Sequence, residues 1–379
     1  MAFDIYINQG TKRLRCGYTT GSCATLASKA AARALLENRI VESEEIITPK
    51  GITVKVDIME YEKKDDSVRC AVKKDAGDDF DATDGILIYS KVELTEEEGI
   101  HIDGGVGVGR VTEVGLNQPV GNAAINTTPR RMITDELTKL AEEHEYSGGF
   151  NVMIDVPNGI EIAKKTFNGK LGIEGGISVI GTTGIVEPQS LQALIDTIKV
   201  EMKMLAAKGD KSIIITPGNY GSAFIKRHPK LKKKTVVSYS NFIGDTLDFG
   251  NAYGFDEILV VSHIGKAVKL AGGIMNTHSR YADCRSEIFA AYAALEGGDK
   301  KVIERIMDAK TTDACIEILK EKNLHDGTID RIIKSAQEHL EYRVAGKYKV
   351  GLVIFSNKYG LLGMSEAGEE IIEGWEKSE

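Results

Sequence analysis

Ser212-Ile-Ile-Ile-Thr-Pro-Gly-Asn-Tyr-Gly221 is the stretch that best predicts the fold class of the second half of the chain. An unbroken apolar run at 213–216 ends in a loop of proline, glycine and polar residues. Similar runs lie at 177–180, 235–239, 257–261 and 350–355, and most are separated by helical segments such as 190–207 and 221–228. Near-continuous apolar runs are typical of strands buried on both faces of a parallel sheet. We therefore predict an α/β three-layer domain with a Rossmann-like, mostly parallel sheet.

The rest of the chain has a different rhythm. Three helical segments between 285 and 343 precede the last apolar run and predict a helical insert. In the first half, helices are expected at 23–37 and 131–145, and strands at 52–59, 68–73, 85–94 and 150–156. No βαβ alternation is evident there, so an α+β domain is the better prediction. The boundary falls within 158–174 and is placed near Lys170, which gives domains 1–170 and 171–379.

The composition excludes several classes of protein. The chain has 48 basic and 56 acidic side chains, a net charge of −8, which argues against a general nucleic-acid binder. No stretch approaches the roughly 20 apolar residues of a membrane span. The five cysteines are odd in number and form no C-x-x-C pair, so a reducing, cytoplasmic compartment is expected.

Two polar motifs in the first half have both a functional and a structural interpretation. Gly17-Tyr-Thr-Thr-Gly-Ser-Cys-Ala24 leads into the alanine-rich helix, and its hydroxyls suit either a carboxylate receptor or an ordinary helix cap. Asp75-Ala-Gly-Asp-Asp-Phe-Asp-Ala-Thr-Asp84 holds five aspartates in ten residues. These carboxylates suit a cation, ribose hydroxyls or a sulfonium, and equally a solvated turn. The order of residues does not match an EF-hand loop.

Two glycine-rich loops are candidates for holding a cofactor. Asp103-Gly-Gly-Val-Gly-Val-Gly109 has D-x-G-x-G-x-G spacing, but no helix follows it, so a cofactor role is the weaker interpretation. Val179-Ile-Gly-Thr-Thr-Gly-Ile-Val-Glu-Pro188 follows an apolar run and precedes a helix. A loop in that position is where an adenosine-bearing cofactor is expected, so this loop is the preferred candidate.

Further polar loops follow the later apolar runs, at 216–221, 240–245, 262–266 and 270–279. Loops that follow successive parallel strands should converge on one crevice. His263 and His278 lie in these loops and are candidates for a general base or proton shuttle, although hydrogen bonding to a strand end is the commoner role. Together with Cys284 they do not have a zinc-ligand spacing, so no resident metal is predicted.

Several of these segments together resemble the CbiD family of cobalt-precorrin-5B C-1-methyltransferases. The resemblance extends in order from the N-terminus to about residue 290. The segments that carry it are 17–24, 75–79, Gly107-Val-Gly-Arg-Val-Thr112, Pro119-Val-Gly-Asn-Ala-Ala-Ile-Asn126, Pro129-Arg130, Gly181-Thr-Thr-Gly-Ile-Val186, Ser240-Asn-Phe-Ile-Gly-Asp245 and Lys266 through Asn276-Thr-His-Ser279. The sequence departs from the family pattern at Val106, Thr127, Thr128 and Ser262.

The resemblance implies methyl transfer from S-adenosylmethionine to C-1 of cobalt-precorrin-5B, giving cobalt-precorrin-6A in the early-cobalt route to cobalamin. S-adenosylmethionine is then a co-substrate, cobalt belongs to the corrinoid substrate, and a homo-oligomer is compatible. Our hypotheses for individual residues go beyond the resemblance. The candidate catalytic residues are His263 and His278. The candidate cofactor residues are Gly181, Thr182, Thr183, Gly184 and Asp245. The candidates for the substrate carboxylates are Thr19, Thr20, Ser22, Arg130, Lys266 and Arg280.

Two other classes of function stay open at this stage. A nicotinamide-dependent oxidoreductase predicts a complete G-x-G-x-x-G after a strand, which the chain lacks. A non-catalytic corrinoid or cobalt carrier predicts a metal-ligand cluster or a corrin-binding histidine motif, and it would bind a corrinoid without S-adenosylmethionine. Mixing the protein with both ligands distinguishes all three.

Overall fold

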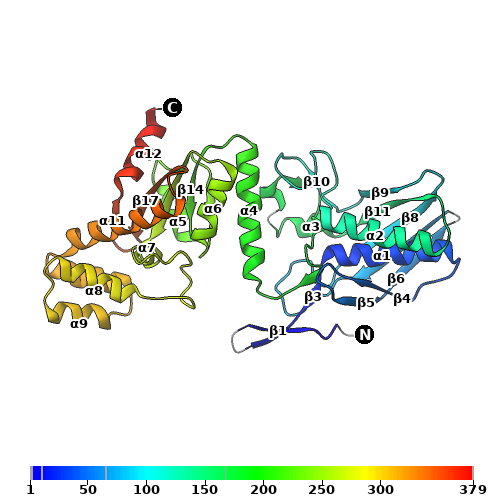
Figure 1. The fold of residues 1–379 in the computed structure, drawn as a ribbon, viewed down its shortest axis with the longest axis horizontal. Helices are drawn as coiled ribbons and strands as arrows, with labels where there is room; N and C mark the ends of the chain where they lie inside the picture. Colours follow the sequence, from blue (N-terminus) through cyan, green and yellow to red (C-terminus); the bar gives the residue numbers. More distant parts are fainter. Residues whose placement is uncertain (1–2, 10–11, 65, 167, 378–379) are drawn as a thin grey trace. The chain divides into compact units, whose positions relative to one another are not determined.

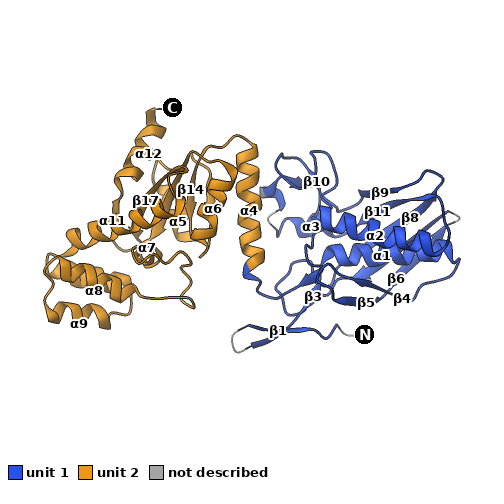
Figure 2. Ribbon diagram, viewed as in Figure 1, with its two compact units in different colours: residues 1–191 blue, residues 192–379 orange. Residues whose placement is uncertain are grey.

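A computed structural model describes residues 3–9, 12–64, 66–166 and 168–377. The chain divides into two compact units, residues 1–191 and 192–379 (Figure 2). The division lies beyond the boundary expected near 170 because residues 171–191 pair with earlier strands. Ile173–Glu174 pairs with Arg110–Val111, and Ile185–Val186 pairs with Gly17–Tyr18. Within the described residues, no helix combines the length and apolar character that a bilayer span requires.

Unit 1 is a mixed α and β structure built on a five-stranded sheet with the order β6-β7-β8-β11-β9 (Figure 1). Neighbouring strands in it are antiparallel, except that β9 runs parallel to β11. Four two-stranded pairs surround it: β1-β2, β3-β13, β4-β5 and β10-β12. The elements are β1 Tyr6–Gln9, β2 Lys12–Arg15, β3 Gly17–Tyr18, α1 Thr20–Leu36, β4 Ser43–Ile47, β5 Thr53–Asp57, β6 Met59–Lys64, β7 Ser67–Lys73, β8 Leu87–Thr95, β9 Ile100–Gly104, β10 Arg110–Val111, α2 Thr127–Glu143, β11 Gly149–Asp155, α3 Gly159–Ala163, the 3-10 turn η1 Asn168–Leu171, β12 Ile173–Glu174 and β13 Ile185–Val186.

The alanine-rich helix α1 forms the centre of the unit 1 core. Its small side chains allow the backbone to approach the sheet closely, because alanine and serine project little from the helix. Ser28 Oγ lies 2.9 Å from Ser90 Oγ of β8, and the Cys70 thiol of β7 donates to the Ala27 carbonyl. Helix α2 packs beside α1. It begins before Pro129, because the first turn of a helix needs no N–H donor.

The strands expected at 52–59, 68–73, 85–94 and 150–156 are present as β5, β7, β8 and β11. The absence of βαβ alternation holds only in part. Strand β9 is parallel to its neighbour β11, and α2 lies between them in the sequence. The glycine-rich stretch that begins at Asp103 starts inside β9 and opens no helix.

Unit 2 is built on a second five-stranded mixed sheet with the order β15-β14-β16-β17-β18. The first four strands are parallel and the edge strand β18 is antiparallel to β17. The elements are α4 Leu191–Ala207, β14 Ser212–Thr216, α5 Asn219–Arg227, β15 Val236–Ser238, α6 Ile243–Tyr253, β16 Glu257–His263, α7 Ile264–Leu270, α8 Arg285–Leu295, α9 Lys300–Asp308, α10 Thr312–Glu321, α11 His325–Val344, β17 Lys349–Ser356, β18 Gly360–Met364 and α12 Glu366–Lys377.

Helices cover both faces of the unit 2 sheet with their apolar sides. Side chains of β14, β16 and β17 on one face pack with α5 and α12 in a cluster that includes Phe224, Phe355 and Trp375. Alternate residues of a strand point to opposite faces, and the buried Ile258 and Ile354 therefore face the other layer. Contacts of α7 and α11 with β17 place these two helices there. Burial on both faces explains why these strands are apolar throughout.

Two expectations for the second half were wrong. Residues 177–180 do not form a strand of this sheet. Ile177 and Val179 make only isolated bridges, to Val108 and Ile125, and they lie in unit 1. The helical region after residue 285 holds four helices rather than three. It is divided where Gly297 adopts φ +92° and Asp299 then accepts a hydrogen bond from the N–H of Val302 as the N-cap of α9.

Candidate active site

The carboxyl ends of three parallel strands bring most of the predicted polar loops of unit 2 to one sheet edge. Strand β14 leads to α5, β15 leads to α6, and β16 leads directly into α7. β14 and β16 are neighbours, and the connection after β14 leads to β15 on one side while the connection after β16 leads to β17 on the other. Such a switch point is where ligands of open α/β sheets commonly bind.

His263 ends β16 and caps α7. Its Nδ1 accepts a hydrogen bond from the N–H of Gly265 at 3.1 Å. Its ring lies edge-on to Phe355 and 6.2 Å from the ring of Tyr220. Burial lowers the pKa of His263, and the charge of Asp313 only partly opposes that effect. The neutral ring therefore carries its proton on Nε2, which makes Nε2–H a donor and leaves no free lone pair for a general base.

The loop at 240–245 is held by a lysine on α7. Lys266 donates from Nζ to the carbonyl of Ser240 at 2.8 Å. Burial, and then the charge of Lys269, lower the pKa of Lys266. Asp245 lies in the first turn of α6, is partly exposed, and contributes to the raised pKa of Arg343. Of these groups, Lys266 and Asp245 both remain partly accessible to a ligand.

His278 and Arg280 lie on an exposed segment after α7. His278 Nδ1 accepts from the N–H of Arg280 at 3.0 Å, so Nε2 carries the ring proton and is a donor. Within the described part of the chain, the guanidinium of Arg280 makes no hydrogen bond or ion pair of its own. Both side chains therefore present N–H donors to solvent.

In unit 1 the start of α1 binds the loop at 180–184 rather than facing solvent. Thr20 Oγ1 accepts from the N–H of Ile180 at 2.9 Å and donates to its carbonyl at 3.1 Å. Ser22 Oγ donates to the carbonyl of Gly184 at 2.7 Å. Thr19 Oγ1 caps the helix through the N–H of Ser22, and the N–H of Thr19 donates to Gly184. All three hydroxyl side chains are buried. The expected carboxylate receptor is thus filled by the protein's own backbone.

The two glycines of this loop are required by close packing. Gly181 has φ +145°, and a Cβ there would lie 2.2 Å from Oγ1 of Thr19. Gly184 has φ +79°, and a Cβ there would lie 2.6 Å from Cβ of Thr48. A side chain at Gly181 would push the loop away from Thr19 at the start of α1, and one at Gly184 would push it away from Thr48, just after β4.

Thr182 and Thr183 form the exposed tip of the loop. The carbonyl of Thr183 accepts from the N–H of Lys50, and its hydroxyl donates to the carbonyl of Ile185. Lys50 also pairs with Glu187 just beyond the loop. The tip is therefore anchored on both sides while its outer surface stays accessible.

Arg130 serves as an internal brace. Its guanidinium donates to the carbonyls of Ile125 at 2.9 Å, Ile102 at 2.7 Å and Ala123 at 3.5 Å. Burial lowers its pKa. Most of its donors are already used, so the predicted contact with a substrate carboxylate would compete with these bonds.

The aspartates of the 75–84 loop also have internal partners. Asp75 binds Arg15 through two hydrogen bonds, which lowers the pKa of Asp75. Asp81 pairs with the buried ammonium of Lys74 at 2.6 Å. These contacts favour the interpretation of this loop as a structural turn. Among the described residues, no group of three or more His, Cys, Asp or Glu is placed to hold a metal.

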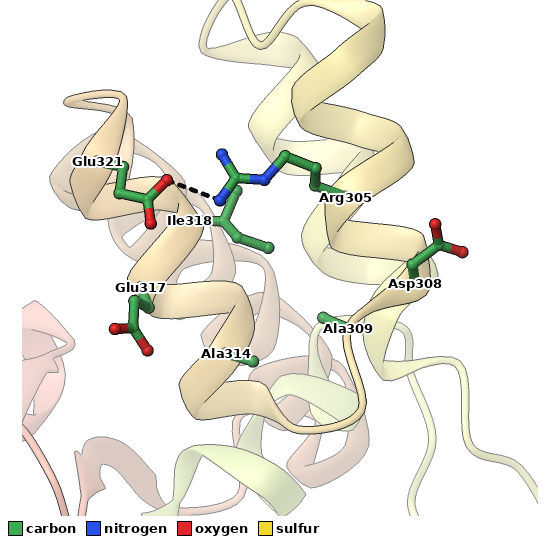
Figure 3. Close-up of a pocket in the computed structure, with 7 residues that line it drawn as sticks. All are labelled: Arg305, Asp308, Ala309, Ala314, Glu317, Ile318 and Glu321. Carbon is green, nitrogen blue, oxygen red and sulfur yellow. Dashed lines mark hydrogen bonds and ion pairs between the residues drawn. The ribbon is translucent and has the colours of Figure 1, made fainter.

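Unit 2 also has two hollows that are lined by other residues than those of the polar loops. The hollow between α9 and α10 has a volume of about 340 Å³, and the ion pair Arg305–Glu321 crosses it (Figure 3). A groove of about 820 Å³ is lined by α11, β17 and the start of α12. Neither is lined by a predicted site residue.

One polar residue near the carboxyl edge of the unit 2 sheet was missed by sequence reasoning. Lys269 on α7 is only 3% exposed, and its ammonium donates to two carbonyls of the following loop. The available signal was a lysine inside the apolar run Ala267-Val-Lys-Leu-Ala271. A charge within a buried run needs internal partners.

Comparison with known proteins gives consistent matches over both halves. The CbiD family model matches residues 7–188, and the model described as "CbiD, C-terminal domain" matches residues 276–366. A Ruminiclostridium cellulolyticum protein named cobalt-precorrin-5B C(1)-methyltransferase is 47% identical, over 93% of this chain and 91% of its own. One of the same name from Thermoanaerobacter sp. is 41% identical, over 97% and 99%. The crystal structure of a cobalamin biosynthesis protein (cbiD) from Archaeoglobus fulgidus is 31% identical, covers 74% and 87%, and has a TM-score of 0.39.

Proposed function

The chain belongs to the CbiD family, and on that premise we propose that it methylates C-1 of cobalt-precorrin-5B, with S-adenosylmethionine as the donor and cobalt-precorrin-6A as the product. The observation that carries the proposal is identity of 47% and 41% to proteins named for this reaction, over more than nine-tenths of each chain. The step belongs to the early-cobalt, oxygen-independent route to cobalamin. Cobalt enters as part of the substrate.

Methyl transfer from a sulfonium to an electron-rich carbon is an in-line displacement, so alignment of the two reactants is the main requirement. Alignment alone can lower a barrier by about 7–11 kcal/mol at best. A strong base is not needed for the transfer itself. This fits the two histidines, whose Nδ1 atoms already accept backbone hydrogen bonds. We assign them to substrate contact through Nε2–H rather than to proton abstraction.

In unit 2 we propose that the sheet and its two helical layers act as a Rossmann-like support with ligand groups at the carboxyl edge. The corrinoid carries several carboxylates, and Lys266 and Arg280 are the proposed cationic partners for them. Charge-assisted hydrogen bonds of this kind are about twice as strong as neutral ones. Asp245, in the first turn of α6, is the proposed hydrogen-bond acceptor for a ligand at this edge of the sheet.

In unit 1 we propose that residues 181–184 contact the methyl donor. Support comes from the exposed tip at Thr182 and Thr183 and from glycines that permit close backbone approach. The hydroxyls of Thr19, Thr20 and Ser22 then act indirectly, by holding this loop on α1. Arg130 acts in a similar way on the carbonyls around Ile125.

Incubation of the protein with cobalt-precorrin-5B and S-adenosylmethionine under anaerobic conditions tests the proposal. Liquid chromatography and mass spectrometry should detect a corrinoid that has gained one methyl group relative to the substrate, and an equal amount of S-adenosylhomocysteine. A redox change that depends on a nicotinamide would support an oxidoreductase instead. Corrinoid binding with no product in the presence of the donor would support a carrier.

Binding calorimetry on Thr182→Ala and Thr183→Ala tests the donor loop separately. The expected result is weaker binding of S-adenosylmethionine, because both threonines lie at the exposed tip of the loop. Unchanged affinity in both variants would remove this loop from the donor site without affecting the proposed reaction.

A further inference from the structure

Helix α7 carries two lysines that fasten two separate loops. Lys266 reaches the carbonyl of Ser240 in the loop before α6. Lys269, one turn further along, reaches the carbonyls of Thr277 at 3.1 Å and Ala282 at 2.7 Å in the loop after α7. The polar side chains of this helix therefore donate hydrogen bonds to backbone carbonyls of neighbouring loops.

Burying the charge of Lys269 is unfavourable because the ammonium loses its hydration. Its side chain is 3% exposed, and burial removes the ammonium from the water that would otherwise solvate it. Among the residues that the structure describes, the carboxylate paired with it is that of Asp283 at 3.6 Å, which is half exposed and already bound by Arg285. The two carbonyls are thus its principal partners. An apolar side chain would fill the same volume without the desolvation penalty of a charge. We therefore infer that the ammonium is needed for its hydrogen bonds and not only for packing.

The two acceptor carbonyls of Lys269 bracket the segment that carries the exposed candidate site residues. His278 and Arg280 lie between Thr277 and Ala282, and the N–H of Arg280 is bonded back to His278. Fixing both ends of a short exposed segment limits the directions in which its side chains can point.

The same segment is also joined to the loop at 240–245. The N–H of Thr277 donates to the carbonyl of Asn241 at 3.0 Å, and its hydroxyl donates to the Asn241 side chain at 3.3 Å. The N–H of Gly244 donates to the carbonyl of Met275 at 3.0 Å. A shift of the 277–282 segment would therefore be transmitted to the turn that carries Asp245.

We propose that Lys269 is a positioning residue of the methyltransferase site: its buried ammonium holds the 277–282 segment so that His278 and Arg280 face the corrinoid substrate. This inference rests on the proposed function for its catalytic consequence, but not for the bracing itself. Lys269 touches no reactant. It acts through the backbone of the segment that does.

Lys269→Met, with Lys211→Met as the matched control, tests this inference. Lys211 also donates to a backbone carbonyl, that of Gly254 at 2.9 Å, but it is exposed and lies at the opposite end of β14. Hydrogen exchange of Lys269→Met should rise in residues 276–283 while β14, β16 and β17 stay protected. We expect kcat/KM for the corrinoid to fall by about 10- to 100-fold, since displacement by about 1 Å can cost that much. The Lys211→Met control should show neither change.

Unchanged exchange in 276–283, or loss of activity only in proportion to the unfolded fraction, would overturn the inference. If Lys269→Met does not fold, Lys269→Gln is measured instead and should show a smaller rise of exchange in 276–283, because its uncharged amide keeps N–H donors on a shorter side chain; no rise would overturn the inference. Absence of methyl transfer by the unmodified protein would refute the proposed function, and the exchange data would still decide the bracing.

Discussion

Replacing Thr20 by valine tests whether the start of α1 holds the loop at 180–184. Valine keeps the shape and β-branching of threonine but removes the hydroxyl. The variant therefore loses the bond that Oγ1 accepts from the N–H of Ile180 at 2.9 Å and the bond that it donates to the Ile180 carbonyl at 3.1 Å. The carbonyl keeps one partner, the N–H of Gly21. The N–H of Ile180 loses its acceptor, Oγ1 of Thr20.

The expected effect follows from these two bonds. A hydrogen bond contributes a net stability of about 0.5–1.5 kcal/mol, so two bonds give about 1–3 kcal/mol. Ile180 is 50% exposed, and water can replace part of what is lost. We therefore expect a local destabilisation of about 1–2 kcal/mol, which corresponds to a 5- to 30-fold change in an opening equilibrium, approximately.

Hydrogen exchange measured by mass spectrometry is the appropriate assay, because it reports local opening. Amides at 180–184 of Thr20→Val should exchange faster by about that factor. Thr134→Val, at an exposed position of α2, is the control and should exchange as the unmodified protein does. S-adenosylmethionine should also bind more weakly to Thr20→Val. Unchanged exchange together with unchanged donor affinity would refute the reasoning.

Two further predictions concern backbone strain and pH. Gly184→Ala should lower the free energy of unfolding of unit 1 by about 1–3 kcal/mol more than Gly51→Ala in circular dichroism denaturation. Both have φ near +79°, but only at Gly184 does a Cβ meet Thr48, so equal effects would show that this contact is unimportant. The pKa of His263 is lowered on folding, so its contribution to stability is present above about pH 6.5 and is lost as the pH falls through the folded pKa. His263→Asn, an N-cap that does not titrate, should make unit 2 less acid-sensitive, as followed by Trp375 fluorescence; identical pH profiles would contradict this.

Much of the fold was predictable because its signals are local. The runs at 213–216, 257–261 and 350–355 are apolar throughout since both sheet faces are covered, and that pattern is visible in the sequence. The run at 177–180 has the same appearance but makes only isolated bridges. Its pairing depends on residues about 50 to 70 positions away, and periodicity carries no information about them.

The candidate site was less predictable because its hydrogen bonds are non-local. The cap residues of α1 were identified, yet the group that occupies them comes from a loop that follows 160 residues later. The loop around His278 follows α7 as expected, but the loop expected at 262–266 is instead the end of β16 running directly into α7. The orientation of each imidazole is set by a backbone N–H two residues on. Arg130 was assigned to a ligand by its charge, whereas its donors go to carbonyls. Assembly into a homo-oligomer stays a prediction.

Transfer of an isotopically labelled methyl group tests the central claim most directly. S-adenosylmethionine with ¹³C in its methyl group is incubated anaerobically with cobalt-precorrin-5B and the protein, and the corrinoid product is analysed by NMR. The account predicts that a single ¹³C-methyl signal is incorporated and that its carbon couplings place it on C-1. Label at another ring position, or no label in the corrinoid while the protein is folded and binds both reactants, would contradict it.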